Sequence, residues 1–242
     1  MTSTLAITGK SGSGKTTLTK AFAEIIKEFH PDKTILLVDN DLTCELAGRF
    51  GLKTYSTIYG IRSGKHEYKT GIPEGMSKQE FIEWALEDII LSVDENIDLI
   101  VSWLVPSKDC RCPITSQMQM ALSKLISSYD FAIFDCEFEL KYLNQLVDYP
   151  IDATLVVTNP DPKSIYLANE IYGFSKKYAL DGEISVLLNK AEENKTEKAI
   201  EQIDAYGLDF AGAIEKFEEN EEENIKEVAK NIYLRLNLPQ KN

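Results

Sequence analysis

The stretch AITGKSGSGKTT, residues 6–17, follows an apolar run and opens an amphipathic one. Gly9, Gly14, Lys15 and Thr16 satisfy the pattern G-x-x-x-x-G-K-[ST], which binds phosphate where a strand leads into it and a helix leads out. Backbone N–H groups approach phosphates closely only where glycine leaves room, and the helix N-terminus adds a favourable dipole. The sequence therefore predicts a loop that binds the phosphates of a nucleotide.

Two residues of this loop are expected to act on the nucleotide through their side chains. Lys15 has the reach to bind the β- and γ-phosphates of ATP, and the Thr16 hydroxyl can ligate Mg²⁺. The other residues expected around the nucleotide are Gly9, Lys10, Ser11, Gly12, Ser13, Gly14 and Thr17. Lys10 stands at a position that ordinary phosphate loops leave nearly free, so its side chain is either incidental or serves a second purpose.

The rest of the chain alternates short apolar runs with longer amphipathic segments, which is the pattern of an α/β fold. The expected strands are residues 4–8, 34–39, 98–103, 130–135, 153–158, 184–189 and 209–214. Several of them contain almost no polar residues, as parallel strands do when helices cover both faces of a sheet. We therefore expect an open, mainly parallel sheet flanked by helices, in a single P-loop domain spanning residues 1–242.

Helical spacing of apolar residues predicts helices over residues 15–29 and 77–93. Ser77 and Glu80 form a capping-box pair at the start of the second one. Residues 53–76 contain glycine, lysine and tyrosine with little periodicity. We expect them to form a mobile excursion near the site.

Composition limits the partners and the compartment. The 242 residues have a net charge of −13 and are 43% hydrophobic, with four cysteines. The acidic balance argues against nucleic acid and anionic membranes as partners. No apolar run approaches the roughly 20 residues that span a bilayer, and the first strand is expected too early to leave room for a signal peptide. Because the cysteines are too few for a disulfide scaffold, we expect a cytoplasmic protein.

Polar residues stand at the ends of three expected strands, at the edge where open α/β sheets place ligands. Asp39 and Asp41 follow the second strand, Asp135 ends the fourth, and Asn189 and Lys190 end the sixth. Alternation of side chains points Asp39 and Asp41 to the same side of the chain. Asp135 is suited to hold the hydration shell of Mg²⁺. These residues are expected to complete a nucleotide site around the loop.

Together with Lys10, these strand-end residues resemble the MinD/ParA class of deviant phosphate loops. In that class the second lysine reaches across a dimer to the partner's nucleotide. The resemblance implies this role for Lys10, implies that Asp41 orients the attacking water, and implies that Asn189 contacts adenine.

The chain also resembles, nearly end to end, one subgroup of that class: the CooC family of nickel-insertion accessory ATPases of carbon monoxide dehydrogenase. The matching segments are GKSGSGKTT, VDNDLTCELAGRFGL, IFDCEFELKYL, TNPDPKSIYLANEIYGFSKKYAL and LLNKAEEN, with a C-x-C before a helix. The resemblance implies a homodimer that closes with ATP and binds a metal between its subunits. It implies that Cys110 and Cys112 are the metal ligands.

Three features depart from the family. Ser11 and Glu139 each stand where the family has glycine, and the last strand lacks the usual proline-containing turn. The position of Glu139 puts a backbone contact to the γ-phosphate in doubt, so hydrolysis is expected to be slow or differently coupled.

The cysteine pair raises its own question in SKDCRCPI, residues 107–114. Thiolate metal sites usually take four ligands, and Cys110 and Cys112 supply two. A two-fold dimer duplicates the pair, and four sulfurs suit Zn²⁺, Ni²⁺ or a [4Fe–4S] cluster. Pro113 predicts a helix over 114–128, whose N-terminus favours thiolate at Cys112. The alternative is two packed thiols in an ordinary loop.

Four functions remain open on the sequence. The leading one is an ATP-dependent metallochaperone that serves carbon monoxide dehydrogenase or a related metalloenzyme. The second is an ATP-driven electron donor resembling the nitrogenase iron protein. The third is a positioning ATPase of the MinD/ParA type, and the fourth is a small-molecule kinase, which would leave Lys10 and the C-x-C pair unexplained.

Overall fold

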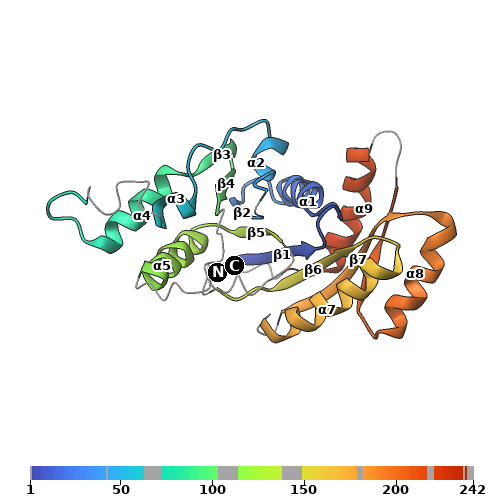
Figure 1. The fold of residues 1–242 in the computed structure, drawn as a ribbon. Helices are drawn as coiled ribbons and strands as arrows, with labels where there is room; N and C mark the ends of the chain where they lie inside the picture. The colour runs from blue at the N-terminus through green and yellow to red at the C-terminus, as the bar shows by residue number, and fades with distance from the viewer. Residues whose placement is uncertain are drawn as a thin grey trace.

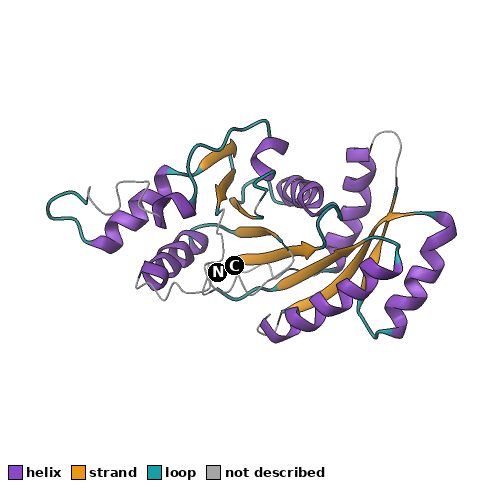
Figure 2. Cartoon of the chain, viewed as in Figure 1, coloured by secondary structure: helices purple, strands orange, loops and turns teal. Residues whose placement is uncertain are grey.

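The computed structural model describes residues 2–41, 43–62, 72–102, 114–137, 149–178, 182–216, 221–236 and 238. Strands and helices alternate along them (Figures 1 and 2). The strands are β1 (Ser3–Gly9), β2 (Ile35–Asn40), β3 (Leu91–Asp94), β4 (Ile97–Val101), β5 (Phe131–Cys136), β6 (Ala153–Thr158), β7 (Glu183–Ala191) and β8 (Phe210–Glu215). The helices are α1 (Lys15–Phe29), α2 (Leu46–Arg49), α3 (Ile58–Arg62), α4 (Lys78–Asp88), α5 (Ile114–Ser127), α7 (Pro162–Tyr178), α8 (Glu193–Ala205) and α9 (Glu221–Arg235).

The described strands form one sheet in the order β3-β4-β2-β5-β1-β6-β7-β8. Neighbouring strands are parallel throughout, except that β3 runs antiparallel to β4 at one edge. The expectation of an open, mainly parallel sheet is confirmed. Because parallel strands end on the same side, the carboxyl ends of β1, β2, β5 and β7 lie at one edge of the sheet.

Helices cover both faces of this sheet, as the apolar composition of the strands predicts (Figure 1). One face packs against α1, α2 and α9 in a single hydrophobic cluster. On the other face, α3, α4 and α5 cover the half that contains β4, β2 and β5, and α7 and α8 cover the half that contains β6 and β7. Each large aliphatic side chain fully buried in these layers contributes roughly 1.5–3 kcal/mol, so the layers fix the frame that holds the strand ends.

Helix α9 brings the far end of the chain onto α1. The Nε2 atom of His30 lies 2.9 Å from the Tyr233 hydroxyl, and Lys230 donates to Glu28 at 2.7 Å. The side chain of Ile225, near the start of α9, is buried in the same cluster as α1. His30 thus helps to fix the packing of α9 on α1.

The expected helix over residues 77–93 is wrong in its second half. Its start is confirmed, because the Ser77 hydroxyl accepts from Glu80 N at 3.2 Å and the Glu80 carboxylate accepts from Ser77 N at 2.7 Å. The helix ends at Asp88, and Leu91–Asp94 pairs with β4 instead. Leu91 packs against the cluster on the opposite face from α4. A continuous helix could not cross the sheet in this way.

The expected excursion over residues 53–76 is also wrong in part. Residues 58–62 form α3, with Ile58 and Ile61 fully buried beneath α4. Residues 63–71 lie outside the described part of the chain. No helix among the described residues is long and apolar enough to cross a membrane.

Candidate nucleotide-binding site

The loop between β1 and α1 has the backbone that a phosphate loop requires. Gly9 has a φ of 148°, and a Cβ there would lie 2.2 Å from the carbonyl oxygen of Val157. Gly14 has a φ of 96°, and its Cβ would lie 2.3 Å from Nδ2 of Asn189. Any side chain at these two positions would clash with the ends of β6 and β7. The two motif glycines are therefore needed to seat the loop against the sheet.

A cavity of about 420 Å³ opens over this loop at the carboxyl edge of the sheet. The loop and the start of α1 line it with Ser11, Gly12, Gly14, Lys15, Thr16 and Thr17. The segment after β2 lines it with Asp41, Thr43, Glu45 and Arg49. Asn189, Lys190 and Ile225 line it from β7 and α9. Four segments far apart in the sequence thus meet at the place where the sequence predicts a nucleotide.

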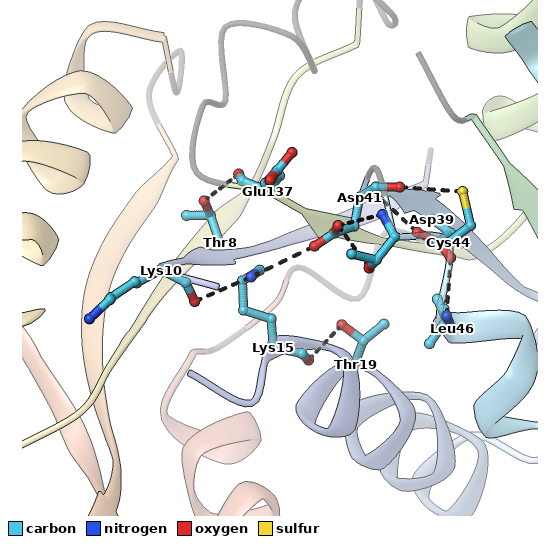
Figure 3. Close-up of polar contacts among 10 residues, drawn as sticks. Thr8, Lys10, Lys15, Thr19, Asp39, Asp41, Cys44, Leu46 and Glu137 are labelled. Carbon is cyan, nitrogen blue, oxygen red and sulfur yellow. Dashed lines mark hydrogen bonds and ion pairs between the residues drawn. The ribbon is translucent and has the colours of Figure 1, made fainter. Parts of the chain in front are cut away.

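Lys15 is buried at the centre of this cavity and is 5% exposed. Its Nζ atom lies 3.4 Å from the carbonyl oxygen of Lys10 and 3.8 Å from Oδ2 of Asp41 (Figure 3). An ammonium has three donors, so these two contacts leave Lys15 able to bind phosphate oxygens. The Asp41 carboxylate therefore stands close to where the anionic phosphates of a nucleotide are expected.

Asp41 and Asp39 hold the segment after β2 in different ways (Figure 3). Oδ1 of Asp41 accepts hydrogen bonds from the backbone N–H and the hydroxyl of Thr43, each at 2.9 Å. The two oxygens of Asp39 accept from the backbone N–H groups of Asp41 at 3.2 Å and Leu46 at 3.1 Å. Asp39 is fully buried and thus shapes the segment that carries Asp41 and the start of α2. The prediction that Asp39 contacts the nucleotide stays a prediction.

The Asp135 carboxylate is buried without a cation paired to it among the described residues. It is fully buried at the end of β5, and neither carboxylate oxygen has a hydrogen-bond partner in the described part of the chain. Burial raises the pKa of Asp135 to about 6, although the nearby Thr16 hydroxyl and Lys15 charge act to lower it. Burial also raises the pKa of Asp39 to about 7, with the Asp135 charge adding to the effect. Unpaired buried oxygens beside a threonine hydroxyl fit Mg²⁺, a hard cation that binds oxygen ligands.

Lys10 points away from the cavity that Lys15 occupies (Figure 3). Its Nζ atom donates to the Ser164 hydroxyl at 3.3 Å, at the start of α7. Ser164 is buried, and its backbone N–H donates to the Asp161 carboxylate at 2.9 Å. The loop thus presents two ammonium groups to two different sides of the molecule.

Asn189 and Lys190 bind the phosphate loop itself. Nδ2 of Asn189 donates to the carbonyl oxygen of Ser13 at 2.7 Å, and its Oδ1 accepts from the Lys190 N–H at 2.9 Å. Nζ of Lys190 donates to the carbonyl oxygen of Gly12 at 3.0 Å. Lys190 adopts a left-handed backbone with a φ of 56°. The amide of Asn189 is therefore engaged with the loop, and its expected contact with adenine stays a prediction.

Residues 3–178 match the model of the AAA domain family. The chain belongs to the AAA domain family. No curated protein matches it.

Solved structures show which fold this AAA domain has. The chain is similar to one from the MinC:MinD cell division protein complex of Aquifex aeolicus, with a TM-score of 0.69 and 17% identity over 99% of this chain and 98% of that one. A plasmid partition protein from Borrelia burgdorferi has a TM-score of 0.66 and 20% identity over 97% and 98% of the two chains. Cobyrinic acid a,c-diamide synthase from Mycobacterium smegmatis, with bound ADP and magnesium, has a TM-score of 0.66 and 18% identity over 95% and 93%. The fold is therefore that of the MinD/ParA-type P-loop ATPases.

Sequence reasoning missed part of this AAA domain's cavity. Ile225 lines it from α9, and Thr43, Glu45 and Arg49 line it from a segment that the family resemblance covers without giving them a role. Their positions follow from packing of α2 and α9 against α1, which motifs do not reveal.

The structure does not test the predicted metal site at the cysteine pair. Cys110, Cys112 and Glu139 lie outside the described residues. Within the described residues, no group of three or more His, Cys, Asp or Glu side chains could hold a metal ion. Cys136 is buried in the core, whereas Cys44 is half-buried with a φ of 51°.

Replacing Asp135 with asparagine is expected to stabilise the nucleotide-free AAA domain at pH 8 while removing its Mg²⁺ response. A carboxyl whose folded pKa is raised from 3.8 to about 6 contributes its stability below pH 4 and loses it as the pH rises through 6. Asparagine has no charge to bury, so the melting temperature should fall less between pH 5 and pH 8 than in the wild type. Thermal melting with and without Mg²⁺ and ATP measures both effects. A variant that melts like the wild type at every pH would contradict this description of Asp135.

Proposed function

We propose that this chain is an ATP-hydrolysing metal-handling factor that works as a nucleotide-gated homodimer in the cytoplasm. ATP binding closes the dimer, and hydrolysis reopens it. Cys110 and Cys112 of both subunits bind the metal cargo, Ni²⁺ or Zn²⁺, between them. The client is carbon monoxide dehydrogenase or a related metalloenzyme, and the whole chain acts as one domain, without nucleic acid or membrane partners.

The observation that supports the gated dimer best is the divergence of the two loop lysines. Lys15 is buried in its own cavity, where the sequence predicts the β- and γ-phosphates. Lys10 extends to the start of α7 instead. A second ammonium on a phosphate loop is redundant within one subunit. It is useful when a partner's nucleotide lies against this face, as the resemblance to MinD/ParA loops implies.

The described residues can supply each part of ATP hydrolysis. Lys15 and the loop N–H groups bind the β- and γ-phosphates, and Thr16 and Asp135 would hold Mg²⁺. When bound, Mg²⁺ neutralises charge on the phosphates. Asp41 accepts a hydrogen bond from the attacking water and orients it toward the γ-phosphorus. The bond from that phosphorus to the bridging oxygen breaks, and ADP and phosphate leave.

Hydrolysis can change the affinity for the metal cargo through the segments that are expected to contact the phosphates. Asp41 belongs to the segment after β2. Asp135 lies near the end of β5, which is the next element of the chain after α5. Helix α5 begins at Ile114, two residues after Cys112 in the sequence. A change in nucleotide state at β5 would therefore act on the element next to the cysteine pair, so that metal affinity changes with it.

The metal is expected to bind at one equivalent per dimer, because each chain supplies two of four thiolates. Replacing Cys110 and Cys112 together with serine should eliminate binding and weaken dimerisation, since the two are thermodynamically linked. Anaerobic purification with elemental analysis and light scattering, with and without ATP, measures both. Cys44→Ser combined with Cys136→Ala is the matched control and should keep the wild-type stoichiometry. Stoichiometric metal in the Cys110/Cys112 double variant would refute the cargo site.

A positioning ATPase is the second candidate, because the similar solved structures include MinD and a plasmid partition protein. The net charge of −13 disfavours it, since DNA and anionic membranes repel an acidic chain. Co-sedimentation with DNA and with anionic liposomes, each with ATP, separates the two functions. ATP-dependent sedimentation with either one would favour positioning over metal handling.

An ATP-driven electron donor is a third candidate, with the four thiolates holding a [4Fe–4S] cluster. Elemental analysis distinguishes it directly. Four irons and four sulfides per dimer in a brown sample would replace the nickel or zinc cargo with a cluster.

A further inference from the structure

Arg49 is the last residue of α2 and lines the nucleotide cavity from the segment after β2. The residue is exposed, so its guanidinium can be reached from solvent at the rim of the cavity. Nothing in the sequence motif assigns it a role. It stands on the same segment as Asp41, which lies beside Lys15.

The charges around the cavity single out Arg49 among the lining cations. Lys15 is already matched by Asp41 at 3.8 Å, and Lys190 donates to the carbonyl oxygen of Gly12. Among the described residues, no ion pair or hydrogen bond engages the guanidinium of Arg49. This holds even though Glu45 lies four residues earlier and lines the same cavity. Arg49 is thus the lining cation whose charged group has no protein partner among the described residues.

The cavity also needs an additional cation once a nucleotide enters. Asp41 and Glu45 line it, and Asp135 is buried beside it. A triphosphate adds its own negative charges to these three carboxylates, and the sum exceeds the three positive charges that Mg²⁺ and Lys15 supply. A guanidinium offers five N–H donors in a planar fork that matches phosphate oxygens.

The segment that carries Arg49 is hydrogen-bonded as a unit. Asp39 accepts from the N–H groups of Asp41 and Leu46, and the Arg49 N–H donates to the carbonyl oxygen of Glu45 at 3.2 Å. Leu46 is fully buried against the core. A contact that fixes the Arg49 side chain therefore also restrains the segment that carries Asp41.

We propose that Arg49 binds the polyphosphate of the nucleotide from the side opposite Asn189 and Lys190. In doing so it holds the segment that carries Asp41 against the bound ATP. The inference rests on the proposed ATP site, and it adds a phosphate-binding residue that lies outside the phosphate loop.

Replacing Arg49 with alanine is expected to weaken MgATP binding about tenfold or more, the usual effect of losing a charge-assisted bidentate contact. Arg49→Lys keeps the positive charge but loses the planar set of N–H donors. Its affinity for MgATP should therefore lie between those of the alanine variant and the wild type. Isothermal titration of the full chain with MgATP measures the affinities. The affinity of Arg49→Ala should also depend less steeply on salt, because one charge contact with the phosphates is gone. Its melting temperature without nucleotide should match the wild type.

Lys33→Ala is the matched control, because it removes one surface cation near the start of β2, at the opposite edge of the sheet. It should bind MgATP as the wild type does. If the wild type and Lys33→Ala bind MgATP and Arg49→Ala binds within twofold of them, the role of Arg49 is refuted while the ATP site stands. If the wild type itself binds no MgATP, the proposed function fails together with this inference.

Discussion

Lys15→Ala is expected to lose MgATP binding, with an affinity at least about 100-fold weaker than that of the wild type. The side chain supplies the buried ammonium at the centre of the cavity, 5% exposed and flanked by Asp41 and the carbonyl oxygen of Lys10. Removing charge-assisted hydrogen bonds to the phosphates costs roughly 3 kcal/mol, which corresponds to a factor of about 100 in affinity. Isothermal titration with MgATP measures the change.

The variant should stay folded, because Lys15 is not a member of the hydrophobic cluster around α1 and, among the described residues, its only ion pair is with Asp41. Circular dichroism and melting without nucleotide check this point. Lys33→Ala again removes a cation far from the cavity and should leave binding intact. An alanine variant at Lys15 that binds MgATP within threefold of the wild type would refute the assignment of this cavity to the nucleotide.

Asp41→Asn is expected to keep ATP bound while hydrolysis falls by about 100-fold or more, because the attacking water is no longer held in line with the γ-phosphorus. Asparagine keeps an oxygen that can accept both hydrogen bonds from Thr43. The fold of the segment should therefore survive. The negative charge 3.8 Å from Lys15 disappears, so ATP binding should become no weaker and can become tighter. Bound ATP that is not hydrolysed should then hold the dimer closed.

Single-turnover hydrolysis and light scattering test this pair of effects. Asp41→Asn is expected to hydrolyse ATP slowly and to be a dimer when ATP is bound. An Asp41→Asn protein that remains monomeric with ATP and hydrolyses it at the wild-type rate would remove Asp41 from the mechanism.

The sequence predicted the parts of this molecule that local chemistry decides. The phosphate loop follows from glycines that alone fit against Val157 and Asn189. The strands follow from apolar runs that the sheet buries on both faces. Each expected strand overlaps an observed one, and the capping box fixed the start of α4.

The parts that were wrong or missed depend on contacts between distant segments. Helical spacing continues through Leu91, but pairing with β4 on the other face of the sheet ends the helix at Asp88. Arg49 and Ile225 reach the cavity because α2 and α9 pack on α1. No spacing within one segment carries that information.

Some roles follow only from hydrogen bonds. Asp39 looks like a nucleotide ligand at a strand end, but both of its oxygens hold the segment that carries Asp41. Asn189 looks like a base-contacting residue, but its amide binds the phosphate loop. A residue's place at a strand end is visible in the sequence, whereas its partners are set by the folded backbone around it.

The most direct test of the account is the mass in solution of Asp41→Asn with saturating MgATP, compared with Asp41→Asn that also carries Lys10→Ala. The Lys10 side chain points away from the nucleotide cavity of its own subunit, so we assign it to the nucleotide of the partner subunit. Light scattering should give twice the chain mass of 27.3 kDa for Asp41→Asn. The double variant should still bind MgATP and remain at the mass of one chain. Equal masses for the two proteins, with ATP bound to both, would contradict the nucleotide-gated dimer.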